Sequence, residues 1–169
     1  TTKPTRSVGT AAVTSMNKLA LAYASSLAPR AALFSVHQNR VLGWAARSDW
    51  LVEEDFHTLM LPLDRPSLFL NLTRGVDLHN GPVGGGEGND LLLESLGVPK
   101  PEAALIAPIR VRGRVVAFLW LDSGTASTVD LPVTSVREVV RLVGMALEVL
   151  VLRQKLRGGA RLTEAASEG

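Results

Sequence analysis

The chain has 169 residues, of which 46% are hydrophobic and 20% are charged, and these values are typical of a single folded domain. The formal net charge of +2 is too small and too evenly spread to indicate binding to nucleic acid or to an anionic membrane. The absence of cysteine excludes disulfides, thiolate metal sites, thiol nucleophiles and thioether-linked cofactors. No apolar run is long enough to span a bilayer and no signal peptide is recognisable, so we expect a cytoplasmic protein.

The two ends of the sequence differ from its middle. Residues 1–9 are small and polar, which predicts a linker, and residues 158–169 are polar and begin with two glycines, which predicts a flexible tail. The folded domain is therefore expected over residues 10–157, flanked as a domain within a longer chain would be. Fourteen arginines against four lysines are typical of a GC-rich bacterial genome.

The first elements in chain order are a helix and a hairpin. Residues Thr10–Ala28 carry apolar side chains at alternating steps of three and four, which predicts an amphipathic helix that Pro29 ends. Two short apolar runs follow, Ala32–His37 and Val41–Ala46, with polar residues between them. This pattern predicts two antiparallel strands.

The middle of the chain is mixed. A third extended run covers His57–Leu63, and Asp64 and Pro66 are suited to start a short helix that ends before Gly75. Residues Val76–Asn89 include five glycines in eight positions, but they lack the spacing of a phosphate-binding or dinucleotide-binding loop. We therefore predict a flexible loop suited to act as a lid, followed by a short helix over Asp90–Leu96.

Two long strands, Ala104–Arg112 and Arg114–Asp122, are joined at Gly113 and predict a second hairpin. Both strands are apolar on both faces, so both faces of the sheet must be covered. The sequence thus predicts an α+β fold in which a central antiparallel sheet carries the N- and C-terminal helices on one face. Short helices and loops would cover the other face and enclose a cavity beneath residues 76–89.

The last element is a long helix over Val133–Arg157. Ser135 and Glu138 have the spacing of a capping box. The helix has more apolar width than the sheet alone can cover, so a second partner is needed, which is the first helix of the same chain, the matching helix of a second subunit, or both. We predict a homodimer, with candidate interface residues Val136, Val143, Leu147 and Leu150.

The order of these elements resembles that of GAF domains over most of Ala12–Arg157. The resemblance is carried by the first hairpin, by Pro108–Arg110 and by the strand GRVVAFLWLDS, which ends in an acidic residue. It implies a regulatory module of a signalling protein that senses a small molecule or dimerises, working with other signalling domains or proteins. The NKxnFx3DE pattern of cyclic-nucleotide binders is not matched after Asn17–Lys18, and the bilin-attaching and methionine-sulfoxide-reductase members need a cysteine, which this chain lacks.

Other chemistry finds little support in the sequence. His37, His57 and His79 lie about twenty residues apart without the close spacing of metal ligands, so no metal and no cofactor are predicted. The acidic run Glu53–Asp55 is interpreted as a solvated turn rather than an acid/base pair. No nucleophile elbow occurs, and the protein is predicted not to be an enzyme.

Five residues are candidates for lining a ligand pocket. Aromatic side chains suit the wall of an apolar cavity, although filling of the core by the same rings remains open, and a histidine and an arginine suit polar anchors. The candidates are Trp44, Phe69, His79, Arg110 and Trp120. Two functions therefore remain: a module that senses an unknown small molecule between sheet and loop, and an interaction or scaffold domain whose pocket is closed by its own side chains.

Overall fold

The computed structural model describes residues 8–48, 56–125, 128 and 130–167. The helices are α1 (Val8–Leu27), α3 (Leu68–Thr73), α4 (Glu87–Ser95) and α5 (Val133–Ser167). The strands are β1 (Arg30–His37), β2 (Arg40–Arg47), β3 (Met60–Pro62), β4 (His79–Pro82), β5 (Ala103–Val111) and β6 (Arg114–Asp122).

The strands form one sheet in the order β3-β2-β1-β6-β5-β4, in which neighbouring strands are antiparallel. Both predicted hairpins are confirmed. Each has two turn residues with positive φ, Gln38 and Asn39 in the first and Arg112 and Gly113 in the second, which is the backbone that a tight hairpin turn matched to strand twist requires.

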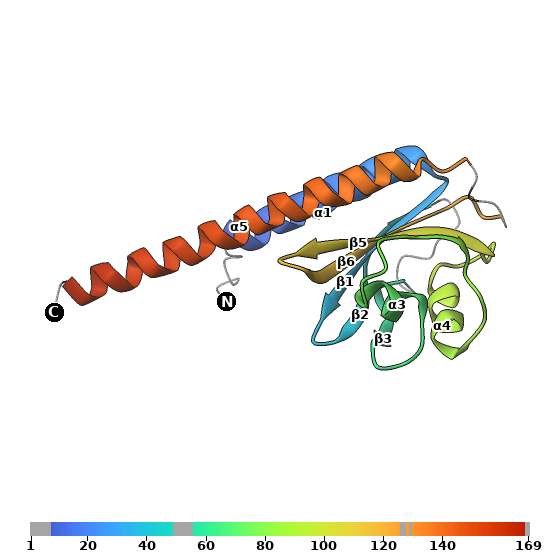
Figure 1. The fold of residues 1–169 in the computed structure, drawn as a ribbon, viewed down its shortest axis with the longest axis horizontal. Coiled ribbons are helices and arrows are strands. Elements are labelled where there is room, and N and C mark those ends of the chain that lie inside the picture. The colour runs from blue at the N-terminus through green and yellow to red at the C-terminus, as the bar shows by residue number, and fades with distance from the viewer. Residues whose placement is uncertain (1–7, 49–55, 126–127, 129, 168–169) are drawn as a thin grey trace, which may run out of the picture.

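Helices cover both faces of the sheet, as the sequence predicts (Figure 1). Helices α1 and α5 run in opposite directions side by side across one face, where the core is made of small and branched side chains such as Ala24, Leu33, Leu119 and Val136. Helices α3 and α4 lie on the other face over a core that holds four phenylalanines and Trp120. The α+β class is therefore confirmed.

The glycine-rich segment is more ordered than its composition suggests. Residues predicted as one loop form strand β4, whose four residues pair with β5 at the edge of the sheet, and the first turn of α4. An edge strand needs only backbone pairing on one side, so it lacks the apolar alternation by which strands are recognised. Helix α3 also begins later than predicted, since Ser67 rather than Asp64 caps it by accepting a hydrogen bond from the Leu70 N–H at 3.3 Å.

A bulge in β2 decides where Trp44 points. The register places Leu33 opposite Ala45 but Phe34 opposite Gly43, so Trp44 is the additional residue. Trp44 and Ala45 consequently both pack on the α1/α5 side of the sheet. Gly43 is required beside it, because a Cβ atom there would overlap the backbone carbonyl oxygen of Phe56.

Helix α5 is longer than predicted. Its 35 residues correspond to about 52 Å, and its C-terminal part runs past the end of the sheet and of α1 (Figure 1). Residues 158–167, predicted as a flexible tail, are helical. Gly158 and Gly159 do not end the helix because Lys, Leu, Arg and Ala on both sides of them are strong helix formers. The boundaries of the domain at residues 10 and 157 stay a prediction.

Candidate functional site

The face of the sheet under α3 and α4, where a ligand cavity was predicted, is filled by aromatic rings. The ring of Phe34 lies 5.2 Å from that of Phe56, 5.1 Å from that of Phe69 and 6.3 Å from that of Trp120, centroid to centroid. The rings of Phe69 and Phe118 are 4.5 Å apart. These are ordinary packing distances for aromatic pairs, and all five side chains are fully buried. The rings therefore act as core here.

The five candidate pocket residues do not form one site. Phe69 and Trp120 lie together in the aromatic core, whereas Trp44 packs on the opposite face of the sheet because of the β2 bulge. His79 and Arg110 lie near α3 at the edge of the sheet. A pocket lined jointly by these five residues is thus not formed, although a pocket of another composition exists beside His79.

The pocket beside His79 is small. Its volume is about 280 Å³, and it is lined by Leu68, Asn71, Leu72, Arg74, Val76 and His79. This volume is below the range of about 300–1,000 Å³ that is usual for ligand sites. The His79 Nε2 atom is 2.9 Å from the Pro82 carbonyl oxygen and 3.2 Å from that of Gly81, so the ring contacts its own strand.

Arg110 has a structural contact. Its guanidinium donates hydrogen bonds to the carbonyl oxygens of Leu72, at 2.8 Å, and Val76, at 3.0 Å. These bonds fasten the C-terminal end of α3 and the segment after it to strand β5. The side chain that was predicted to anchor a ligand therefore anchors the chain itself.

A buried ion pair between Arg30 and Asp122 lies where β1 begins and β6 ends. The Arg30 Nε donates to Asp122 Oδ2 at 2.8 Å and its Nη2 to Oδ1 at 2.9 Å, and neither side chain is exposed to solvent. Arg30 also donates to the carbonyl oxygens of Leu96 and Pro99, and Trp120 Nε1 donates to Asp122 Oδ2 at 2.7 Å. The pair joins β1, β6 and the segment after α4, so we assign it a structural role.

The candidate dimer residues of α5 belong to the core of their own chain. Val136, Val143 and Leu147 are between 0% and 6% exposed, and Leu150 is partly buried against the same cluster. They face α1 and the sheet because both elements pack against this side of α5. The side chains assigned to the seam between subunits are therefore corrected to core residues, while dimerisation itself stays a prediction.

A different stripe of α5 is exposed. Five large apolar side chains, each between 41% and 73% exposed, follow one another at steps of three, four, three and four: Leu142, Met145, Val149, Leu152 and Leu156. This is the spacing of the a and d positions of a coiled coil. The sequence predicts a second partner for α5, and α1 of the same chain packs against the helix. A partner for this exposed stripe in a second subunit stays a prediction.

The polar edge of α5 carries an exposed ion pair between Glu138 and Arg141. The Arg141 Nη2 lies 2.6 Å from Glu138 Oε1, one turn away. The hydrogen bond from Arg141, assisted by its charge, lowers the pKa of the Glu138 carboxyl below its ordinary value of 4.5 and raises that of Arg141. The only sign of this pair in the sequence is the spacing of three residues between Glu138 and Arg141.

The described residues contain neither a cluster of metal ligands nor a membrane-spanning helix. Within 8–48, 56–125, 128 and 130–167, no three histidine, aspartate or glutamate side chains gather as metal ligands would. None of the helices in the described part of the chain is long and apolar enough to cross a membrane. The acidic run Glu53–Asp55 lies outside the described residues.

Comparison with known proteins places the fold. No model of a known protein family matches the chain, and no curated protein matches it either. Among solved structures, the blue-light absorbing form of the PixJ GAF domain of Thermosynechococcus elongatus is similar, with 13% identity, coverage of 92% of this chain and 96% of that one, and a TM-score of 0.72.

Two further structures show how widely this architecture is used. The GAF-B domain of DevS from Mycobacterium smegmatis has 13% identity, coverage of 85% and 98%, and a TM-score of 0.63. A type II free methionine-R-sulfoxide reductase from Thermoplasma acidophilum has 13% identity, coverage of 84% and 95%, and a TM-score of 0.57. With its antiparallel sheet, paired terminal helices and two short covering helices, this chain has the GAF fold.

Proposed function

We propose that the chain is a regulatory module of a signalling protein, without catalytic activity of its own, that pairs with a second copy of itself through helix α5. The GAF fold supports this proposal, since the similar structures include the receptor PixJ and a methyl-accepting chemotaxis protein. The absence of cysteine argues against the reductase activity of the third neighbour, because the resemblance implies that such members use a cysteine.

The observation that carries the proposal is the exposed stripe of α5, defined above as Leu142, Met145, Val149, Leu152 and Leu156. Burial of large side chains that are 41–73% exposed in one copy is favourable, since apolar surface removed from water contributes roughly 25 cal/mol per Å². The stripe continues along the part of α5 that runs past the sheet, where no other described element of the chain covers it (Figure 1).

Charges beside the stripe favour a parallel pair. With Leu142 and Val149 at a positions, Glu148 falls at g and Arg153 at the e position that follows it. In a parallel coiled coil, a g residue lies beside the next e residue of the partner helix, so the two copies would form two Glu148–Arg153 pairs. The second copy is therefore complementary in charge as well as in apolar surface.

The filled aromatic core favours a module that acts through protein contacts over one that senses a ligand in this core. Phe34, Phe69 and Trp120 occupy the space between sheet and α3 where the sequence analysis expected a small molecule. A scaffold that acts through its helices needs no ligand on this face. We therefore favour the interaction module over a sensor whose ligand lies in the aromatic core.

Substitution of exposed residues tests the dimer without disturbing the core. We expect the unchanged chain to have the mass of a dimer by light scattering, and the Leu152→Glu/Leu156→Glu variant to have that of a monomer, because charge on the stripe opposes its burial. The matched control is Met60→Glu/Leu91→Glu, which changes two apolar side chains that are similarly exposed elsewhere and should remain dimeric. A monomeric unchanged chain, or equal loss of the dimer in the control, would contradict the proposal.

A charge exchange tests the orientation. Glu148→Arg alone and Arg153→Glu alone place like charges opposite each other and should weaken the dimer, and the double variant should recover it in part. Recovery in the double variant supports the parallel arrangement. Additive weakening in the double variant contradicts the parallel arrangement, even where the unchanged chain is a dimer.

A further inference from the structure

A groove runs between helix α5 and the edge of the sheet at β5, apart from the aromatic core. Its volume is about 410 Å³, which falls within the usual range for small-molecule sites. Its apolar lining residues include Leu78, Val140 and Met145, and four arginines also line it: Arg110, Arg112, Arg137 and Arg141.

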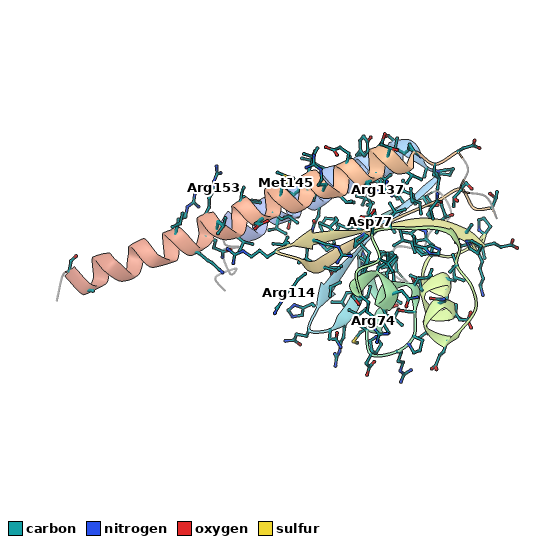
Figure 2. The ribbon with its side chains drawn as sticks, viewed as in Figure 1. Arg74, Asp77, Arg114, Arg137, Met145 and Arg153 are labelled. Atoms are coloured by element: carbon teal, nitrogen blue, oxygen red, sulfur yellow. The ribbon has the colours of Figure 1, made fainter. Side chains whose placement is uncertain are left out.

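Close packing of α5 on β5 gives the groove its shape. Gly144 lies against the backbone of Arg110, and a Cβ atom at Gly144 would overlap the carbonyl oxygen of Arg110. Arg137 and Arg141 are one helical turn apart, so their side chains leave the same face of α5. Asp77 lies across from Arg137 (Figure 2), on the segment that Arg110 fastens to β5.

Arg110 is bonded to backbone carbonyl oxygens, and each of the other three guanidinium groups holds a carboxylate. Arg137 pairs with Asp77 at 2.9 Å, Arg141 with Glu138 at 2.6 Å and Arg112 with Glu148 at 4.0 Å. All six side chains are between 42% and 75% exposed, and exposed ion pairs contribute little to stability. Exchange of one of these carboxylates for an incoming oxyanion therefore costs little, while the guanidinium groups are already oriented.

We propose that this groove binds a small organic oxyanion. Its phosphate or carboxylate group would pair with Arg137 in place of Asp77 and with Arg141 in place of Glu138, because the planar guanidinium matches either group with two hydrogen bonds. Its apolar or planar part would lie on Leu78, Val140 and Met145.

Such a ligand would also reach the surface assigned to the dimer. Met145 lines the groove and belongs to the exposed stripe of α5. A ligand that holds the Met145 side chain therefore changes one contact of the stripe. Binding of the oxyanion does not itself rest on the proposed dimer.

Calorimetric titration of the full chain tests this site with three probes. Phenyl phosphate joins an aromatic ring to one dianionic phosphate group, phthalate joins a ring to two carboxylate groups, and inorganic phosphate lacks the ring. We expect saturable binding of phenyl phosphate, phthalate or both, tighter than that of inorganic phosphate, and the preferred probe tells phosphate from carboxylate ligands. Absence of saturable binding of both aromatic probes at millimolar concentration would overturn the proposal.

Matched variants locate the binding. Arg137→Gln/Arg141→Gln should weaken it by about tenfold or more, because two charge-assisted contacts are lost. Arg40→Gln/Arg65→Gln removes the same charge from exposed positions outside both the groove and helix α5, and should change the affinity by less than about twofold. Equal loss in both variants would show unspecific attraction and overturn the site.

Two more variants complete the test. Asp77→Asn should tighten binding, because it removes the carboxylate that competes for Arg137, whereas Glu102→Gln, an exposed position away from the groove, should not. The Leu152→Glu/Leu156→Glu variant should still bind the aromatic probes saturably. Binding that survives in a monomer separates this inference from the proposed dimer, and binding that is insensitive to both Arg137→Gln/Arg141→Gln and Asp77→Asn contradicts it.

Discussion

Arg30 and Asp122 illustrate how much one buried pair can organise. The two side chains take part in five hydrogen bonds. Two join Arg30 to Asp122, two join Arg30 to carbonyl oxygens of the segment after α4, and one joins the Trp120 N–H to Asp122. A sixth joins the Gly124 N–H to Asp122 Oδ1 at 2.8 Å. Because both side chains are fully buried, removal of one leaves a charge in the interior that water does not reach.

We expect Arg30→Met to lower the free energy of unfolding by about 3–5 kcal/mol, the usual cost of leaving a buried charge without its partner. Urea denaturation measures this change. The Arg30→Met/Asp122→Leu variant should recover part of the loss, since both charges are then gone. Arg65→Met is the control, because its pair with Glu87 is exposed and should matter little; a comparable loss there would refute the assignment.

Glu138 provides a prediction on pH. Its pKa is lowered in the folded chain by the hydrogen bond from Arg141, so the contact is present above the unfolded pKa and is lost as the pH falls through the folded one. Titration followed by carboxyl carbon NMR should give Glu138 a midpoint below 4.5. In Arg141→Gln the midpoint should move up; an unchanged midpoint would mean that Arg141 is not the cause.

Helix α5 shows two kinds of apolar side chain at the scale of one element. Leu147 faces α1 and the sheet, and Leu152 faces solvent. Leu147→Ala should cost about 2–5 kcal/mol in unfolding free energy, because it leaves a cavity in the core. Leu152→Ala should change the stability of one folded copy by less than about 0.5 kcal/mol. Denaturant curves measure both in a Leu156→Glu background, once light scattering has shown that this background is monomeric, and equal costs would contradict the assignment of faces.

Hairpins and the terminal helices could be predicted from the sequence because their apolar patterns are local. Strand β4 could not be, since edge pairing by His79–Pro82 leaves no pattern, and neither could the end of α5, since adjacent glycines are a usual sign of a helix end. Periodicity also showed that α5 has two apolar faces. Which face meets the sheet depends on the packing of α1, which no local pattern records.

The candidate site was less predictable than the fold. Trp44 turns away from Phe69 because of one additional residue in β2, and a bulge has no clear sequence signature. Arg137 and Arg141 are exposed polar side chains of α5, which by themselves indicate no site. Their proximity to Arg112 follows from the approach of α5 to β5 at Gly144, a contact between residues distant in sequence.

On the scale of the whole molecule, one sheet separates two hydrophobic cores of different residue composition. The α1/α5 side is built from small and branched residues, and the α3/α4 side from rings. Phe69→Ala should therefore lower the free energy of unfolding by about 3–5 kcal/mol. Because the resulting cavity is apolar, benzene should raise the melting temperature of this variant and not that of the unchanged chain. A similar rise in both would show that the aromatic side already holds a void.

Two adjacent glycines, Gly158 and Gly159, lie inside α5 near its C-terminal end. Up to Arg157 the helix has no glycine pair; its first turns pack on the sheet, and the rest extends past the sheet. At Gly158 and Gly159 each residue disfavours the helix by about 0.8–1.0 kcal/mol relative to alanine, and glycine pairs are where helices bend. A bend of α5 is therefore favoured at Gly158 and Gly159 over the part of the helix before Arg157, so these two residues set where the direction of the helix can change most easily beyond the sheet.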